Sequence, residues 1–174
     1  MKIIGLAGKA RTGKDTVSLH LVKNYGFKQF SFAEHLKQVA EVAGWDGLKD
    51  ERGRRLLQNM GDVLREYDSK IFIKQLIGRI KYYEKFCLET GIECRIVISD
   101  IRLIQEIEAL KDLNASIWFI HRTVNYNGTV PAHATESLTD SSWKFDYVFD
   151  NNGTFEELYD GVDSTVKDIL NVGC

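Results

Sequence analysis

The sequence predicts an α/β fold in which helices cover both faces of an open, parallel sheet of five strands. Three observations support it: short apolar runs alternate with segments of helical period, a glycine-rich turn follows the first apolar run, and one run is rich in β-branched residues. The chain has 174 residues, 44% hydrophobic and 28% charged, which suits a globular domain with a sizeable core. Because it holds a single proline, Pro131, no proline-rich linker divides it, and we expect one domain over residues 1–174.

Two strand–helix units are expected first, followed by helices alone. The run KIIGLA is short and apolar, as in a buried strand, and FKQFSF alternates apolar and polar residues. The stretch after Asp50 has no such run but carries two apolar stripes at helical spacing, with breaks near Gly61 or Asp68. The predicted elements are strands at 2–7 and 27–32, helices at 15–25 and 33–43, and two or three helices over 50–89.

The second half of the chain continues the alternation of strands and helices. The β-branched run RIVIS is typical of a strand buried in a parallel sheet, and Thr154 and Glu157 have the spacing of a capping box. A polar stretch of weak periodicity contains Pro131 and is long for a connection, which indicates a loop or lid over 122–142. The predicted elements are strands at 95–99, 116–121 and 147–149, and helices at 104–113 and 154–170.

The sharpest motif is GKARTGKDT at residues 8–16, which matches Gly-x-x-x-x-Gly-Lys between the first strand and the first helix. Glycines let successive backbone N–H groups turn toward phosphate oxygens, the helix N-terminus adds its positive dipole end, and Lys14 brings an ammonium group. The pattern predicts a three-layer P-loop NTPase fold; the alternative is a glycine-rich turn that binds nothing. The residues expected to hold phosphates are Gly8, Arg11, Thr12, Gly13, Lys14, Asp15 and Thr16.

Two carboxylates are candidate ligands for magnesium. Asp15 stands where a serine or threonine hydroxyl is usual, so either Asp15 joins the Mg²⁺ shell or Thr16 reaches in; we favour Asp15. Asp100 follows the RIVIS strand, where it can hold a Mg²⁺ water or polarise an acceptor, although a helix N-cap is the alternative. Arg102 places a cation beside that carboxylate, as phosphoryl transfer requires.

Composition excludes several classes of function. Twenty-three Lys+Arg against 25 Asp+Glu give a net charge of -2, so no global basic field indicates a nucleic acid polymer. The three cysteines are odd in number and never spaced Cys-x-x-Cys, which favours reduced thiols. Neither a signal peptide nor a run long enough to span a membrane is visible. We therefore expect a cytoplasmic protein without a membrane partner.

Six segments in order, GKARTGKDT, FSFAEHLK, RRLLQNMGDVLRE, ISDIR, HATES and DNNGT, resemble the bacteriophage-type deoxynucleoside monophosphate kinases, within the P-loop nucleoside monophosphate kinases. The resemblance runs from residue 3 to about 170. It implies transfer of the ATP γ-phosphoryl group to a dNMP with Mg²⁺, in the host cytoplasm if the source is a phage, by an enzyme of a kind that can be dimeric. Alternatives are a kinase for another acceptor, dephospho-CoA-like or phosphomevalonate-like, or a nucleotide-binding protein without turnover.

The resemblance implies an acceptor-binding region of helices at about 33–90. Phe32 can stack a base and Lys37 can meet a phosphate, against the alternative of a core phenylalanine and a solvated lysine. Four residues of RRLLQNMGDVLRE share a helix face: Gln58 can read a base edge, Gly61 can admit close approach and Arg65 can clamp a phosphate. The alternative there is a solvated surface. The expected acceptor residues are Phe32, Lys37, Arg54, Gln58, Gly61, Arg65, Arg102 and Glu136.

The lid over 122–142 and the DNNGT turn complete the expected site. Arg122 begins the lid and is the best candidate for a transition-state arginine, and Arg11 can share the charge neutralisation. His133 and Glu136 match the family's His-x-x-Glu segment, and the resemblance implies that Asn152 and Gly153 pack on the ATP adenine, where the alternative is a plain capping turn. The expected catalytic residues are Lys14, Arg65, Asp100, Arg102 and Arg122.

Overall fold

The computed structural model describes residues 1–123 and 145–171. The chain divides into two compact units: a sheet unit, formed by Met1–Gln29 and Glu93–Cys174, and a helical unit, Phe30–Ile92. Most of the expected lid, including Pro131, His133 and Glu136, lies outside the described residues. The helical unit covers the range in which the sequence predicts acceptor-binding helices.

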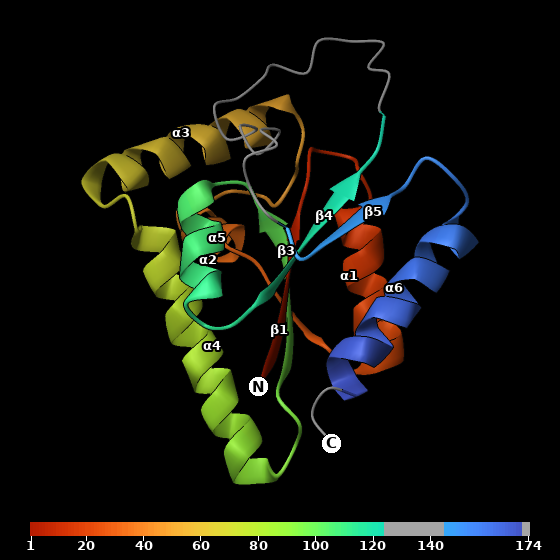
Figure 1. Cartoon of the computed structure of the whole chain (residues 1–174). Helices are drawn as coiled ribbons and strands as arrows, with labels where there is room; N and C mark the ends of the chain where they lie inside the picture. The colour runs from red at the N-terminus through yellow and green to blue at the C-terminus, as the bar shows by residue number, and fades with distance from the viewer. Residues whose placement is uncertain (124–144, 172–174) are drawn as a thin grey trace. The chain divides into compact units, whose positions relative to one another are not determined.

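The sheet has five strands in the order β2-β3-β1-β4-β5. Figure 1 labels four of them, β1, β3, β4 and β5. Its register pairs β1 with β3, β1 with β4 and β4 with β5 in parallel. The strands are β1 (Lys2–Ala7), β2 (Lys28–Phe30), β3 (Arg95–Ile101), β4 (Ser116–His121) and β5 (Tyr147–Asp150). The predicted five-stranded parallel sheet is confirmed. One difference matters for function: β3 runs past its predicted end at Ser99, so Asp100 lies inside the strand.

Helices cover both faces of the sheet unit. Side chains alternate along β1, so Ile4 and Leu6 face α1 (Lys14–Tyr25) and α6 (Phe155–Asn171) while Gly5 faces the opposite side. An added Cβ at Gly5 would lie 3.3 Å from Leu110 Cδ1 on α5 (Ile104–Lys111), which therefore covers that opposite face. These helices and the sheet form the predicted three layers.

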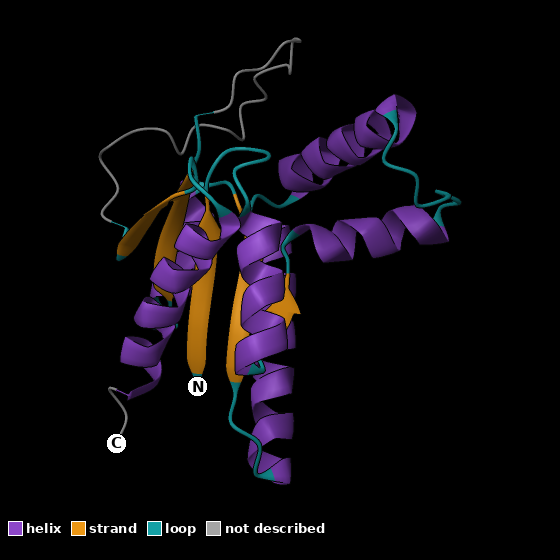
Figure 2. Cartoon of the chain, turned by 90° about the vertical axis from the view of Figure 1, so that its right-hand side faces the viewer, coloured by secondary structure: helices purple, strands orange, loops and turns teal. Residues whose placement is uncertain are grey.

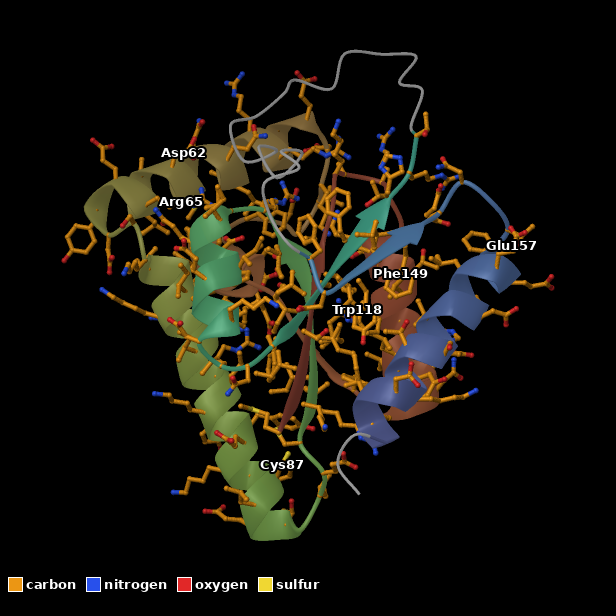
Figure 3. The ribbon with its side chains drawn as sticks, in the orientation of Figure 1. Asp62, Arg65, Cys87, Trp118, Phe149 and Glu157 are labelled. Carbon is orange, nitrogen blue, oxygen red and sulfur yellow. The ribbon has the colours of Figure 1, made fainter. Side chains whose placement is uncertain are left out.

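An apolar core lies between the sheet and the α1–α6 layer. Trp118 is fully buried, and its ring centroid lies 5.1 Å from that of Phe149. Figure 3 labels both side chains. Burying side chains of this size contributes roughly 1.5–3 kcal/mol each. The buried members of the cluster are Ile4, Leu6, Val17, Leu21, Phe27, Val97, Trp118, Ile120, Leu158, Val162 and Val166.

A polar cluster joins α1 to α6 beside this core. His20 Nε2 lies 2.5 Å from Asp163 Oδ1, and the His20 ring stacks on Tyr159 with centroids 4.2 Å apart. Burial raises the pKa of Tyr25 to about 12, and its hydrogen bond to Asp163 acts in the same direction. Burial also acts to raise the pKa of Asp163, but hydrogen bonds from His20 and Tyr25 outweigh it, so this carboxyl has a pKa below its usual value.

The predicted capping box at the start of α6 is confirmed. Thr154 N donates to Glu157 Oε2 at 2.8 Å, and Glu157 N donates to Thr154 Oγ1 at 3.2 Å. The two side chains thus satisfy backbone donors at the helix N-terminus, and α6 begins at Phe155.

The helical unit contains α2 (Ala33–Val42), α3 (Glu51–Tyr67) and α4 (Ile71–Thr90), coloured purple in Figure 2. The break predicted near Gly61 or Asp68 occurs at Asp68, the C-cap of α3, whose carboxylate accepts from Lys70 N and Lys74 Nζ. Gly61 instead lies buried within α3. Two helices, α3 and α4, therefore form over the range 50–89, where two or three were predicted, and α2 is the helix predicted at 33–43.

The apolar stripe of α3 packs less deeply than its sequence suggests. Leu57, Met60 and Leu64 are only half-buried, and the buried positions of this helix are Gly53 and Gly61. The reason is a narrow contact with α2: an added Cβ at Gly61 would lie 3.4 Å from Leu36 Cδ2. The helix backbone, rather than a row of large side chains, approaches its neighbour there.

The sequence predicts that no segment spans a membrane and that the cysteines are reduced thiols. Over residues 1–123 and 145–171, none of the helices combines the length and the hydropathy that a membrane crossing requires. Cys87 and Cys94 are buried, and Cys174 lies outside the described residues.

Candidate functional site

The loop at residues 8–13 joins β1 to α1 at the carboxyl edge of the sheet. Gly8 has φ 141°, Gly13 has φ 104° and Arg11 has φ 63°, so three backbone positions take conformations with positive φ. An added Cβ at Gly8 would lie 2.5 Å from the carbonyl oxygen of Ile120. The glycine is required there because the loop passes directly over the end of β4.

Side chains of the motif close the loop on itself. Lys14 Nζ donates to Gly8 O at 2.8 Å and to Lys9 O at 2.6 Å, and Thr12 Oγ1 donates to Lys9 O at 2.9 Å. Thr12 is buried, whereas Arg11 is exposed. The ammonium of Lys14 therefore lies at the loop, next to the first turn of α1, whose backbone N–H groups have no acceptor within the helix. This arrangement favours a polyanion such as a phosphate chain.

The ends of neighbouring strands bring further residues to the same edge. The register pairs Ala7 with Ile101 and with Phe119, and His121 with Asp150, so the residues that follow β3, β4 and β5 lie along one edge with the loop. Arg102 and Arg122 follow β3 and β4, and both are exposed. Of the predicted residues in the sheet unit, Arg11, Lys14, Asp100, Arg102 and Arg122 therefore share this edge.

Asp100 does not cap the helix that follows it. The N-cap of α5 is Leu103, and the carboxylate that satisfies the exposed backbone donors is Glu106, which accepts from Arg102 N at 2.8 Å and Leu103 N at 3.0 Å. The capping alternative for Asp100 is therefore wrong, because β3 continues to Ile101 before the helix begins. Glu106 is buried and holds the segment that carries Arg102, a role that sequence reasoning missed.

Asn152 and Gly153 lie in an exposed turn between β5 and α6. Asn152 N donates to Asp150 Oδ1 at 2.9 Å, and Asn152 Oδ1 accepts from Thr123 N at 2.8 Å. The residue before them, Asn151, is buried, and its Nδ2 donates to Thr12 O at 2.8 Å. Sequence reasoning missed Asn151, since its partner lies in the phosphate loop at the other end of the chain.

The residues available for magnesium fit that ion. Asp15 is exposed in the first turn of α1, Thr16 is half-buried beside it, and Asp100 is half-buried at the end of β3. The described part of the chain has no group of three or more His, Cys, Asp or Glu side chains suited to a metal. Mg²⁺ in phosphoryl-transfer sites is typically bound by one or two carboxylates together with phosphates and water, and the carboxylates of Asp15 and Asp100 suit that chemistry.

The predicted acceptor residues described by the structure lie mostly in the helical unit. Phe32 precedes α2 and is only 5% exposed, which matches the core alternative, and Lys37 is half-buried. Arg54 and Gln58 are exposed on α3. Of the predicted acceptor residues, Arg102 belongs to the sheet unit, and Glu136 lies outside the described residues.

Arg65 of α3 contacts two neighbouring side chains, and Figure 3 labels it beside Asp62. Its guanidinium carbon lies 5.0 Å from the centroid of the Phe72 ring, and its Nη1 lies 3.4 Å from Asp62 Oδ1. A second arginine of this unit, Arg79, pairs with Glu34 at 2.6 Å and was not predicted from the sequence. An arginine over an aromatic ring is oriented without being neutralised.

Two solved structures share the fold of this chain. The chain is similar to a dephospho-CoA kinase from Campylobacter jejuni, with a TM-score of 0.56 and 11% identity, covering 100% of both chains. It is also similar to a candidate kinase from Chloroflexus aurantiacus, with a TM-score of 0.55 and 16% identity, covering 99% of this chain and 97% of that one. These similarities show a shared fold, and the glycine-rich loop adds a phosphate-binding motif to it.

The family follows from sequence comparison. The model of the family described as deoxynucleotide monophosphate kinase matches residues 49–162, so the chain belongs to the deoxynucleotide monophosphate kinase family. A candidate deoxynucleotide monophosphate kinase of Acanthamoeba polyphaga mimivirus is 29% identical, over 95% of this chain and 96% of that protein. A Staphylococcus epidermidis dephospho-CoA kinase is 33% identical over 138 residues, which are 69% of this chain and 64% of that protein. The chain is therefore a phosphotransferase, and the family resemblance predicted from six segments is confirmed.

Proposed function

We propose that this kinase transfers the γ-phosphoryl group of ATP to a deoxynucleoside monophosphate and releases ADP and the deoxynucleoside diphosphate. The observation that carries the proposal is the phosphate loop, with Lys14 Nζ held 2.8 Å from Gly8 O at the N-terminus of α1, in a chain of this family. The whole chain, 1–174, acts as one kinase in this proposal, with the sheet unit binding ATP and the helical unit binding the acceptor.

The loop and the DNNGT turn form the proposed ATP site. Phosphates bind the backbone N–H groups and Lys14, and the adenine packs on the turn that follows β5. The turn's own hydrogen bonds, which tie Asn152 to Asp150 and to Thr123, support this because they fix its backbone. The proposed ATP-contacting residues are Gly8, Arg11, Thr12, Gly13, Lys14, Asp15, Thr16, Arg122, Asn152 and Gly153.

The proposed acceptor site uses Arg65 as the clamp on the substrate phosphate. To bind that phosphate, Arg65 has to give up its contact with Asp62. This contact is long, at 3.4 Å, and both side chains are partly exposed, so losing it costs little free energy. A charge-assisted, bidentate pair with phosphate is stronger than the contact it replaces. The other proposed acceptor residues are Phe32, Lys37, Arg54, Gln58, Gly61, Arg102 and Glu136.

Phosphoryl transfer requires positioning and charge neutralisation rather than covalent catalysis by the protein. The acceptor phosphate is already a nucleophilic dianion, so no general base is needed. Lys14, Arg102 and Arg122 neutralise charge on the transferring group, and Arg11 shares this work. Asp15 and Asp100 would hold Mg²⁺, which would supply further neutralisation of the phosphate oxygens.

A second candidate acceptor is dephospho-coenzyme A. The observation that favours it is the 33% identity to the Staphylococcus epidermidis dephospho-CoA kinase. That match covers 64% of the relative, whereas the mimivirus relative is matched over 96% of its length, which favours the nucleotide acceptor.

ADP release with a panel of acceptors tests both candidates. The panel contains dAMP, dGMP, dCMP, dTMP, the four ribonucleotides and dephospho-coenzyme A. We expect one or more deoxynucleotides to stimulate ADP release, and Lys14→Ala to abolish it. Lys23→Ala, which changes an exposed lysine in the last turn of the same helix, is the matched control and should retain full activity. Stimulation by dephospho-coenzyme A alone would overturn the proposed acceptor.

A further inference from the structure

Asn151 is held at two points along the carboxyl edge of the sheet. Its backbone N–H donates to the carbonyl of His121 at 2.7 Å, and its side-chain Nδ2 donates to the carbonyl of Thr12 at 2.8 Å. The residue is only 3% exposed. A buried amide that reaches from the end of β5 into the phosphate loop stabilises the loop's conformation directly.

The contact leaves no room between the amide and the loop backbone. An added Cβ at Gly13 would lie 2.3 Å from Asn151 Nδ2, so the side chain of Asn151 occupies the space that a side chain at position 13 would need. Gly13 also has φ 104°, a conformation that residues other than glycine rarely adopt. Asn151 and Gly13 therefore fit each other as a pair.

The orientation of one peptide follows from this contact. The carbonyl of Thr12 and the N–H of Gly13 belong to the same peptide group, and in a trans peptide they point in opposite directions. Because Asn151 holds the carbonyl on its own side, the Gly13 N–H is directed away from Asn151. Asparagine suits this task since its amide donates without charge, whereas an aspartate would place an anion against a carbonyl.

We propose that Asn151 is a positioning residue for ATP: it fixes the Thr12–Gly13 peptide so that the Gly13 N–H faces the bound phosphates. This inference rests on the proposed function, because it requires ATP phosphates in the loop. It also links the proposed adenine turn to the phosphate loop, since Asn151 directly precedes that turn.

ATP titration of three variants of the full chain tests the proposal. Asn151→Asp keeps the shape and removes the donor, so ATP affinity should fall at least about tenfold, the effect of an unpaired buried carbonyl beside a new charge. The KM for the dNMP should stay within about twofold of the unaltered chain, since the acceptor is bound elsewhere. Asn151→Ala should likewise lower the affinity for ATP and leave the KM for the dNMP nearly unchanged. Asn114→Asp, an equivalent change at an exposed turn, should alter neither constant.

The outcomes separate this inference from the proposed function. ATP binding by the unaltered chain with equal affinity in Asn151→Asp would overturn the inference alone. Equal increases in both KM values, together with a lower melting temperature, would assign Asn151 a purely structural role and would overturn it as well. Failure of the unaltered chain to bind ATP would overturn the proposed function and this inference with it.

Discussion

Replacing Gly8 by alanine should damage the phosphate loop in a way that the structure allows to be sized. The added Cβ would lie 2.5 Å from Ile120 O and 3.0 Å from Thr12 Oγ1, and the backbone at Gly8 has φ 141°. The backbone conformation contributes about 1–3 kcal/mol of strain and the clash with a carbonyl a further 1–3 kcal/mol. We therefore expect Gly8→Ala to lower the free energy of unfolding by about 2–6 kcal/mol and to abolish ATP binding.

Gly26→Ala is the matched control for this change. Gly26 also has a positive φ, 68°, but no heavy atom lies within 4 Å of an added Cβ. Its cost should therefore be the backbone strain alone, about 1–2 kcal/mol, with ATP binding retained.

Urea denaturation and ATP titration of both variants provide the comparison. The difference between the two losses in free energy of unfolding gives the contribution of the clash with the end of β4. If Gly8→Ala lost no more stability than Gly26→Ala, the close packing of the loop against β4 would be refuted.

Three further predictions concern the acceptor, the metal and the α1–α6 contact. Arg65→Ala should raise the KM for the dNMP at least about tenfold without changing the KM for ATP, whereas Arg55→Ala, at an exposed position of the same helix, should change neither. EDTA should abolish turnover, and Asp15→Asn should raise the Mg²⁺ concentration that gives half the maximal rate. The pKa of Asp163 is lowered on folding, so the stability it contributes is present above its unfolded value and lost as pH falls; Asp163→Asn should reduce the drop in melting temperature below about pH 4.

Each of these predictions has an outcome that would contradict it. Unchanged kinetics in Arg65→Ala would remove the clamp and leave the kinase family assignment standing. An unchanged Mg²⁺ requirement in Asp15→Asn would favour Thr16 as the metal-side residue. An equal loss of stability in acid for Asp163→Asn would mean that the carboxylate beside His20 contributes no pH-dependent stability.

Features set by local chemistry could be predicted from the sequence. The phosphate loop needs glycines where φ is positive, at Gly8 and Gly13, and the capping box needs Thr154 and Glu157 three residues apart. Both requirements involve residues close together in the chain, so a sequence pattern carries them. The alternation of apolar runs and helical segments predicted the parallel sheet for the same reason.

Features set by distant contacts could not be predicted in this way. The end of β3 depends on its pairing with β1, which extends the strand through Asp100 to Ile101. The hydrogen bond from Asn151 to Thr12 links residues that are far apart in the sequence. The sequence around either residue therefore does not indicate this contact. The sequence allows Phe32 either to stack on a base or to lie in the core, because periodicity does not distinguish the two. The residue is only 5% exposed, which matches the core alternative.

The most direct test of the central claim follows the phosphoryl group itself. ATP labelled in its γ-phosphate is incubated with the chain, Mg²⁺ and each dNMP, and the products are separated. The account predicts label in the β-phosphate of a deoxynucleoside diphosphate, and loss of that product in Lys14→Ala but not in Lys23→Ala. Label recovered only as inorganic phosphate, or in no dNDP of the panel, would contradict it.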